Sequence, residues 1–353
     1  NANYYHCLGG FFLFRWRVHM SWRHLVSFTL LLGFQAQAAE EINVYSARQA
    51  HLIEPIVKQF TQQTGIKVNL VYAEDGLAER LKREGKLTPA DLVLTVDISR
   101  LMELVDGDLV QPVSSSVLEQ AIPAQYRDEQ GRWFALTTRV RNIYSSKERL
   151  GKLETIRYED LADAKYKGRI CTRSGKHPYN VALVASLLAH QGEAKTRQWL
   201  EGVKANLARK PQGNDRDQVK AIKEGICDLS LGNSYYYGNM LEDATQKSWA
   251  EAVYLNFPNQ ADRGAHVNVS GVVMTKFAKH PVAAKRLMEY LAGDQAQGLY
   301  AELNKEYPVK PGVALSPLVA SWGEFRADTL SLSEIAKHRR QAVTLLDEVK
   351  FDL

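Results

Sequence analysis

The chain has 353 residues, which is enough for two ordinary domains with their own hydrophobic cores. Hydrophobic residues make up 45% and charged residues 24% of it, the proportions of a soluble globular protein. Basic residues exceed acidic ones by 45 to 40, but residues 1–38 hold three arginines and no acid, so the rest is nearly balanced at 42 to 40. This balance gives no reason to expect nucleic acid as a partner.

The first 38 residues have the pattern of an export signal. Residues 20–24 (Met-Ser-Trp-Arg-His) are a short basic segment, and residues 25–34 are an apolar run too short to span a bilayer. Residues 36–38 read Ala-Gln-Ala, as at a cleavage site. We interpret residues 20–38 as a signal peptide and residues 1–19 as upstream sequence, with one extended signal as the alternative.

The mature protein is then expected to begin at Ala39 and to be soluble and located outside the cytoplasm. No later apolar run reaches membrane length, which predicts no integral membrane segment. The mature part contains Cys171 and Cys227, neither in a C-x-x-C motif, in a compartment that permits disulfides. A disulfide between them and two buried free thiols both remain open.

Strands alternate with helices in the first part of the mature chain. The first helix carries an apolar face and is stopped by Gly65. Such alternation implies a parallel sheet covered by helices. The predicted strands are 41–45, 66–72 and 91–96, and the predicted helices are 51–63, 76–85 and 99–105.

A second α/β run lies between two long extended stretches, 133–145 and 266–275. Its predicted strands are 168–172 and 228–232, and its predicted helices are 179–190, 195–205 and 218–225. The last third is mostly helical, and residues 330–349 have a good amphipathic pattern that begins with Ser331 and Glu334 at capping-box spacing.

The fold class is therefore α/β, with two doubly wound lobes joined by a two-strand hinge and a ligand cleft between them. We expect residues 39–138 and 267–353 to form lobe 1 with the C-terminal helices, and residues 139–266 to form lobe 2. Ligands in such architectures bind near the carboxyl ends of strands. The sequence contains none of the motifs G-x-S-x-G, P-loop, H-E-x-x-H or G-x-G-x-x-G, so it gives no positive sign of an enzyme.

Three consecutive tyrosines, Tyr235, Tyr236 and Tyr237, directly follow the strand predicted at 228–232. They cannot all enter one core from a strand or a helix. One interpretation is a partly exposed aromatic turn. The other is a ligand platform that stacks an organic ring or supplies phenolates to a hard metal. Tyr179 follows the strand 168–172 in the same way, although a packing role at a helix start is the alternative for it.

The sequence resembles the periplasmic ferric-iron-binding proteins of ABC importers, which have a type-II periplasmic binding fold related to transferrin lobes. The resemblance covers essentially the whole mature chain, and its motifs are specific only in combination. The segments that carry it are 44–49 (VYSARQ), 90–94 (ADLVL), 137–141 (TTRVR), 168–174 (GRICTRS), 179–180 (YN), 213–215 (GND), 233–236 (NSYY), 266–271 (HVNVSG) and 306–308 (EYP).

The resemblance implies that Tyr179, Tyr235 and Tyr236 bind Fe³⁺ and that Tyr237 packs. Ferric iron is a hard cation that prefers anionic oxygen, and three phenolates neutralise its charge. The resemblance also implies a monomer without catalytic activity that delivers iron to the permease of an ABC importer.

The sequence departs from some relatives at Gln49 and Ala50, where those relatives carry a histidine and a fourth tyrosine. This points to the subclass with three tyrosines and a synergistic anion such as carbonate or bicarbonate, or water. We expect Arg139, Arg48 and Gln49 to hold the anion, because a guanidinium fork suits a planar oxyanion. For the arginines the alternative is a salt bridge, and for Gln49 it is a solvated loop. Two nearby histidines, His51 and His177, are expected to be solvent-exposed, and the alternative for His51 is a register-shifted metal ligand.

Other solutes remain open for the same fold: a polyamine, a thiamine-like ring or an oxyanion, which a tyrosine cluster could stack or cage. A periplasmic enzyme or a sensor ectodomain is the alternative from a different class. Tyr179→Phe separates metal binding from stacking, because only a metal needs the hydroxyl.

Overall fold

The computed structural model describes residues 40–353. The predicted signal peptide and its cleavage site lie outside the described residues. Within residues 40–353 no helix combines the length and the hydropathy that a bilayer crossing requires.

The first part of the chain builds a parallel sheet, as the sequence predicts. Strand β1 (Glu41–Ser46) pairs in parallel with β2 (Lys67–Tyr72) on one side and with β3 (Leu92–Thr95) on the other. Helix α1 (Ala50–Thr64) follows β1, buries four apolar side chains spaced for one helical face, and ends at Gly65 with φ of 73°. The next helices are α2 (Leu77–Glu84), α3 (Ile98–Asp106) and α4 (Ser116–Ala121).

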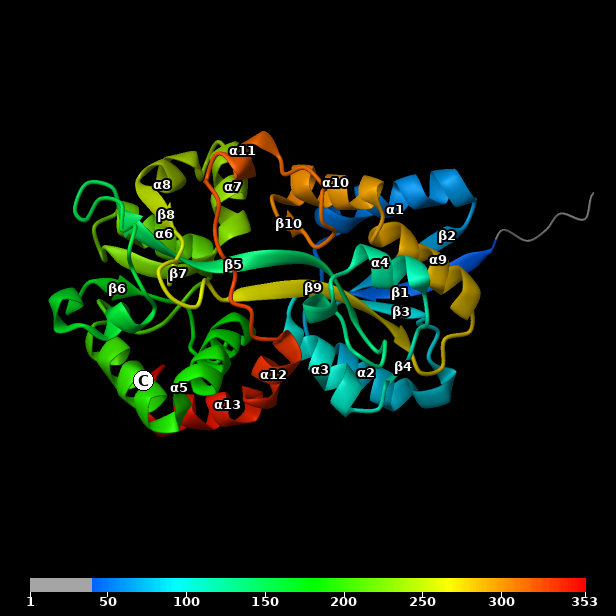
Figure 1. The fold of residues 1–353 in the computed structure, drawn as a ribbon, viewed down its shortest axis with the longest axis horizontal. Helices are drawn as coiled ribbons and strands as arrows, with labels where there is room; N and C mark the ends of the chain where they lie inside the picture. The colour runs from blue at the N-terminus through cyan, green and yellow to red at the C-terminus, as the bar shows by residue number, and fades with distance from the viewer. Residues whose placement is uncertain (1–39) are drawn as a thin grey trace, which may run out of the picture. The chain divides into compact units, whose positions relative to one another are not determined.

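Two long strands, β5 (Phe134–Ser146) and β9 (Val267–Thr275), run antiparallel to each other through the middle of the sheet (Figure 1). Strand β9 also pairs with β3, whereas β5 continues past β9 to pair with β7 (Leu229–Asn233). The strand order is β2-β1-β3-β9-β5-β7-β6. The two predicted extended stretches are confirmed. The division into lobes at residues 139 and 267 stays a prediction.

The remaining strands are short. Strand β6 (Ile170–Cys171) pairs in parallel with β7, and β8 (Val253–Asn256) and β10 (Tyr307–Pro308) pair with β5. Strand β4 (Val110–Gln111) pairs with β9. Short 3₁₀ turns occupy Gly85–Leu87, Ala124–Tyr126, Glu159–Ala162 and Ala164–Tyr166.

The second α/β run contains the helices that carry the candidate site. Helix α5 (Pro178–Ala205) is interrupted at Gly192, whose φ of 78° and ψ of 175° are not helical, so the two predicted helices are both present. It is followed by α6 (Asp215–Lys223), α7 (Ser234–Glu242) and α8 (Lys247–Glu251). Helix α7 was not among the predicted helices, and the three tyrosines lie in its first turn rather than in a loop.

The last third is helical, as predicted. Its elements are α9 (Pro281–Leu291), α10 (Asp294–Asn304), α11 (Pro317–Ala320), α12 (Leu332–Lys337) and α13 (Arg339–Glu348). The amphipathic segment 330–349 is two helices rather than one, with His338 between them. Ser331 caps α12 by accepting a hydrogen bond from the Glu334 backbone N–H at 3.2 Å. Both helices pack against α5, and α12 also packs against α3 (Figure 1).

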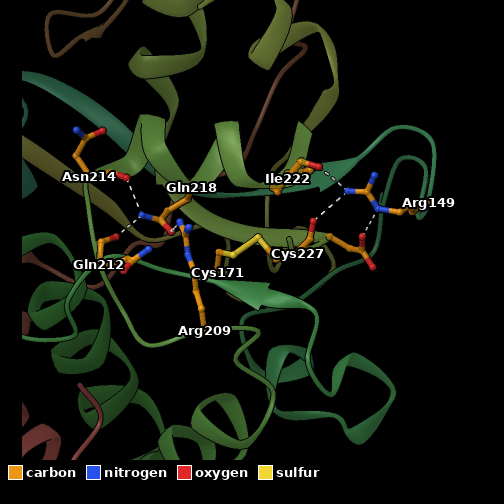
Figure 2. Close-up of a disulfide and its surroundings, with 9 residues drawn as sticks. Arg149, Cys171, Arg209, Gln212, Asn214, Gln218, Ile222 and Cys227 are labelled. Carbon is orange, nitrogen blue, oxygen red and sulfur yellow. Dashed lines mark hydrogen bonds and ion pairs between the residues drawn. A yellow bond between two sulfur atoms is a disulfide. The ribbon is translucent and has the colours of Figure 1, made fainter. Parts of the chain in front are cut away.

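Cys171 and Cys227 form a disulfide, with their Cα atoms 5.8 Å apart (Figure 2). Cys171 ends β6, and Cys227 lies two residues before β7, so the bond joins two neighbouring parallel strands. Both cysteines are buried in a small apolar cluster with Tyr144, Ile222 and Met240. The disulfide therefore ties together the two strands whose carboxyl ends lead into the tyrosine segments.

Candidate metal centre

A cleft of about 460 Å³ is lined by all six residues that the sequence predicts as metal or anion ligands. These residues come from β5 and from the segments that follow β1, β6 and β7. They are Arg48, Gln49, Arg139, Tyr179, Tyr235 and Tyr236.

The three tyrosines come together because β6 and β7 are parallel neighbours, so that their carboxyl ends lie at one edge of the sheet. Tyr179 is the second residue of α5, and Tyr235 and Tyr236 are the second and third residues of α7. The rings of Tyr235 and Tyr236 lie 4.2 Å apart between centroids. Tyr237 packs against Tyr144 and Trp322, at centroid distances of 6.2 and 5.7 Å, as predicted for a packing residue.

Burial and crowding keep two of these phenols protonated in the metal-free protein. Burial is the largest cause that raises the pKa of Tyr235 well above its ordinary value, followed by its neighbours Tyr179 and Tyr236. Burial and Tyr179 raise the pKa of Tyr236 as well. A ligand that takes these groups as phenolates must therefore displace their protons, which a trivalent cation does and a neutral ring does not.

Arg139 lies beneath the tyrosines, with its guanidinium carbon 5.6 Å from the Tyr179 ring centroid and 5.9 Å from that of Tyr235. The side chain is 1% exposed. Its Nη1 lies 3.4 Å from Oε1 of Glu306, while Nε and Nη2 have no hydrogen-bond partner among residues 40–353. Two buried N–H groups with no partner are an unusual cost, which an exogenous acceptor would remove.

Arg48 faces the same acid. Its Nη1 and Nη2 donate to the two carboxylate oxygens of Glu306 at 2.9 and 3.3 Å. Both arginines therefore form the salt bridge that was the alternative to anion binding, and Glu306 is the shared partner. Glu306 belongs to the 306–308 motif, but nothing in the sequence pattern indicates that this acid pairs with the two arginines.

The beginning of α1 forms the facing wall of the cleft. Gln49 precedes the helix, is exposed, and makes no capping hydrogen bond with its side chain. Ala50 lines the cleft with only a methyl group, so this position offers no oxygen ligand. His51 is exposed, as predicted.

Three further arginines line the cleft that the sequence did not single out: Arg100, Arg173 and Arg216. Arg173 lies 5.4 Å from the Tyr179 ring centroid and Arg216 lies 4.6 Å from that of Tyr236. The cleft wall therefore contains five arginines against two acids, Glu74 and Glu306. This excess favours anionic ligands and the anionic form of the phenols.

His177 is not exposed as expected but half-buried in the cleft wall. Its Nδ1 accepts a hydrogen bond from the Tyr179 backbone N–H at 3.2 Å, and the two rings lie edge to face at 4.5 Å. Burial, and then the charge of Arg173, lowers the pKa of His177 to about 3, so the ring is neutral near pH 7.

Arg141 and Arg139 alternate on β5, but Arg141 turns to a buried network instead of to the cleft. It donates to Asp215 at 2.5 Å, to Asn180 at 2.7 Å and to Asn233 at 3.1 Å. Burial alone would raise the pKa of Asp215, but Arg141 and Arg173 outweigh it and hold the pKa below its ordinary value. Asn180 directly follows Tyr179, and Asn233 directly precedes α7, which carries the other two tyrosines. Through its hydrogen bonds to these two asparagines, Arg141 stabilises both tyrosine segments.

The residue types in this cleft narrow the metals that would suit it. Within residues 40–353 no group of three or more His, Cys, Asp or Glu side chains is arranged to hold a metal. The candidate donors are phenol oxygens, which suit hard, highly charged cations rather than the soft or divalent metals that thiolates and imidazoles select.

Comparison with known proteins agrees with the motif resemblance. The family described as bacterial extracellular solute-binding protein matches residues 55–327. "Iron uptake protein A1" of Synechocystis sp. is 44% identical over 312 residues, which are 88% of this chain and 87% of that protein.

Solved structures give the same picture. Apo ferric ion-binding protein A of Pasteurella haemolytica superposes with a TM-score of 0.86 at 59% identity, over 89% of this chain and 99% of that one. A Trichodesmium protein solved with iron and citrate ligands has a TM-score of 0.85 at 38% identity, over 88% and 99%.

These relatives confirm the two-lobed periplasmic-binding-protein fold and the motif resemblance on which the ferric-iron prediction depends. They also confirm that the chain is a binding protein rather than an enzyme, because the named relatives are solute-binding proteins. The chain belongs to the bacterial extracellular solute-binding protein family.

Proposed function

We propose that this protein captures ferric iron in the periplasm and delivers it to the permease of an ABC importer. The observation that carries the proposal is the meeting of Tyr179, Tyr235 and Tyr236 in one cleft beside Arg139. Two nitrogens of the buried Arg139 guanidinium have no hydrogen-bond partner in the described part of the chain. The relatives named for iron uptake and ferric iron binding support the same cargo.

The three tyrosines are the proposed iron ligands. Free phenol has a pKa of roughly 10, and burial raises the pKa of Tyr235 and Tyr236 further, so iron must compete with protons for these oxygens. A trivalent cation does so by its charge, and three phenolates give a neutral centre that still has coordination positions to fill.

A synergistic anion, carbonate or bicarbonate, is proposed to fill those positions. Arg139 would hold it through Nε and Nη2, which form a planar fork that matches two oxygens of a carboxylate-like anion. Arg48 and Gln49 line the same cleft at the amino end of α1 and would contact the anion from that side. Glu306 pairs with both arginines and neutralises part of the positive charge of this buried pair.

Delivery follows from the architecture. Closure of two lobes around the metal would create the conformation that a permease recognises. The protein would act as a monomer. Relatives named as periplasmic ferric iron-binding proteins support the periplasm as the compartment.

The test is a titration of the metal-free protein with ferric nitrilotriacetate, in bicarbonate buffer, followed by desalting and a visible spectrum. A phenolate-to-iron charge-transfer band should appear and reach its plateau at one iron per chain. Tyr179→Phe and Tyr236→Phe should weaken binding by more than the roughly 10–100-fold typical of residues outside the coordination shell. Tyr237→Phe is the matched control and should bind like the parent. A colourless protein that retains no iron would rule out the proposal.

A second candidate is an anionic solute without iron, which the five cleft arginines favour. The same excess of positive charge disfavours a polyamine or a thiamine-like cation. An anionic solute would bind to the metal-free protein and would tolerate Tyr179→Phe. Calorimetry with phosphate and citrate in the absence of iron distinguishes the two candidates.

A further inference from the structure

The loop that presents Tyr179 is held from outside the cleft by Asp352. Ser174 Oγ donates to Asp352 Oδ2 at 2.6 Å, and the Gly175 backbone N–H donates to Asp352 Oδ1 at 2.7 Å. Both carboxylate oxygens are therefore engaged by two consecutive residues of the loop between β6 and α5. Hydrogen bonds to a charged acceptor are among the stronger ones in proteins.

The contact is close enough to require a glycine. A Cβ atom placed on Gly175 would lie 2.6 Å from Phe351 Cδ1 and 2.8 Å from Leu346 Cδ2, distances that real Cβ atoms do not adopt. Phe351 is buried, and Gly175 is buried beneath it. The end of α13 and the residues that follow it thus pack directly on the backbone of the Tyr179 loop.

The loop transmits this contact to the tyrosine through a short series of hydrogen bonds. The His177 backbone N–H donates to the Ser174 carbonyl at 3.2 Å, and His177 Nδ1 accepts from the Tyr179 backbone N–H. Asn180 Nδ2 donates to the Ser174 carbonyl at 3.0 Å and to the Arg173 carbonyl at 3.2 Å. A shift of Ser174 would therefore displace His177 and Asn180, the residues on either side of Tyr179 that bond to it.

The same terminal segment is anchored at its other end to the first part of the chain. Arg339, the first residue of α13, donates to the Ser99 carbonyl at 2.7 Å and pairs with Asp106 at 3.3 Å, and both of these residues lie in α3. Lys204 of α5 donates to the carbonyls of Val349 and Lys350, at 3.1 and 2.6 Å. These contacts fix α13 to both α3 and α5. Asp352, which follows α13, is therefore held in a fixed position from which it binds the loop.

We infer that Asp352 is a positioning residue for the iron site: it fixes the Ser174–Gly175 turn and thereby the place of the Tyr179 hydroxyl. This inference rests on the proposed function, because it takes Tyr179 as an iron ligand. Asp352 does not touch the metal, so its effect must pass through Tyr179 and must disappear when the Tyr179 hydroxyl is removed.

The experiment uses Asp352→Asn in the full chain, which keeps the size of the side chain but removes its charge and one of its two acceptors. The apparent dissociation constant for ferric iron is measured by competition with citrate, together with the position of the charge-transfer band. We expect affinity to fall about tenfold and the band to shift, since one charged hydrogen bond is lost. In the Tyr179→Phe background, Asp352→Asn should change affinity less than twofold.

Asp347→Asn is the matched control. Asp347 lies near the end of α13, five residues before Asp352, and pairs with Lys176 of the same loop, but both side chains are about half exposed, at 54% and 52%. An exposed pair of this kind contributes little, so the control should bind iron like the parent. Ser174→Ala, which removes one of the two bonds to Asp352, should give a smaller loss than Asp352→Asn.

The possible outcomes are distinct. A parent protein that shows no charge-transfer band overturns both the proposed function and this inference. A parent that binds iron while Asp352→Asn binds equally well overturns this inference alone. The inference also fails if Asp352→Asn lowers affinity by the same factor with and without the Tyr179 hydroxyl, because the effect would then be a general loss of stability.

Discussion

Oε1 of Glu306 lies 3.4 Å from Nη1 of Arg139, so an internal carboxylate already shares the guanidinium proposed to hold the exogenous anion. The same acid pairs with Arg48 at 2.9 Å, and all three side chains are at most 4% exposed. One acid between two buried cations leaves an excess positive charge, and that excess would favour binding of the proposed anion.

Replacement of this acid is the first test. Glu306→Gln should lower the free energy of unfolding of the metal-free protein by about 3 kcal/mol, because removing one partner of a buried ion pair leaves the other uncompensated. Added bicarbonate should restore part of the loss, since it would supply the missing negative charge. Thermal unfolding with and without bicarbonate measures both effects. An equal loss at every bicarbonate concentration would contradict an anion site beside Glu306.

Acid should destabilise the protein through His266. Burial lowers the pKa of His266 to about 4, and neither ring nitrogen has a hydrogen-bond partner among residues 40–353. The unfolded chain takes up a proton near pH 6.5 and the folded chain only near 4, so stability is full above pH 6.5 and falls as the pH decreases towards 4. We expect a loss of about 2 kcal/mol between pH 7 and pH 5 from this residue.

His266→Leu tests this prediction, because within the described residues the ring makes no hydrogen bond that an apolar side chain would break. Urea unfolding at pH 7 and pH 5 should show a smaller difference for the variant than for the parent. His177, whose pKa burial lowers to about 3, adds a similar acid-dependent loss that the variant retains. The same pH dependence in parent and variant would exclude His266 as a cause.

The disulfide should contribute to stability rather than to redox regulation. It closes a separation of 56 residues, and its cysteines are at most 2% exposed. The replacement of both cysteines by alanine should lower the free energy of unfolding by about 4 kcal/mol, the loop-closure contribution expected for a loop of this length. Dithiothreitol should leave the folded protein unchanged and lower the urea midpoint only under conditions where the chain unfolds. Rapid reduction of the native protein, followed by alkylation and mass spectrometry, would show that the bond is accessible after all.

Much of the fold could be predicted because the pattern and the structure depend on the same local physics. Strands β1, β2 and β3 and helix α1 follow from alternating and helical apolar periodicity, and each begins or ends within a few residues of the prediction. The break in α5 at Gly192 also leaves a local signal, since a left-handed φ favours glycine.

Other features depend on contacts between distant residues and leave no local signal. Helix α7 was missed because its first turn is filled by aromatic residues of weak helix propensity, and packing against β5 and α8 decides its conformation. The segment 330–349 keeps one amphipathic period across His338, so its break into α12 and α13 was invisible in the pattern.

In the candidate site too, some residues have a local sequence signal, whereas the positions of others depend on contacts between distant residues. Tyr179, Tyr235 and Tyr236 stand out because each follows a strand, and the motif resemblance predicts them as metal ligands. The parallel pairing of β6 with β7 brings them together. Glu306 could not be placed, because it reaches Arg139 across 167 residues. The half-buried His177 is the N-cap residue of α5 and accepts a hydrogen bond from the Tyr179 backbone N–H, a role that the sequence alone did not reveal.

Ala50 offers the sharpest test of why an anion would be needed. It lines the cleft at the first residue of α1 with only a methyl group, where some relatives in the resembled family carry a fourth tyrosine. Ala50→Tyr would place another phenol opposite Tyr179, Tyr235 and Tyr236. Four phenolates around Fe³⁺ give a net charge of minus one, which removes the need for an exogenous anion and opposes its entry. Iron binding by the variant should therefore become independent of bicarbonate, whereas binding by the parent should weaken in bicarbonate-free buffer. Ala50→Phe is the matched control, because it adds the ring without the oxygen and should keep the bicarbonate dependence of the parent. If Ala50→Tyr and Ala50→Phe respond to bicarbonate alike, the added ring fills space without reaching the metal, and the charge argument for the anion fails.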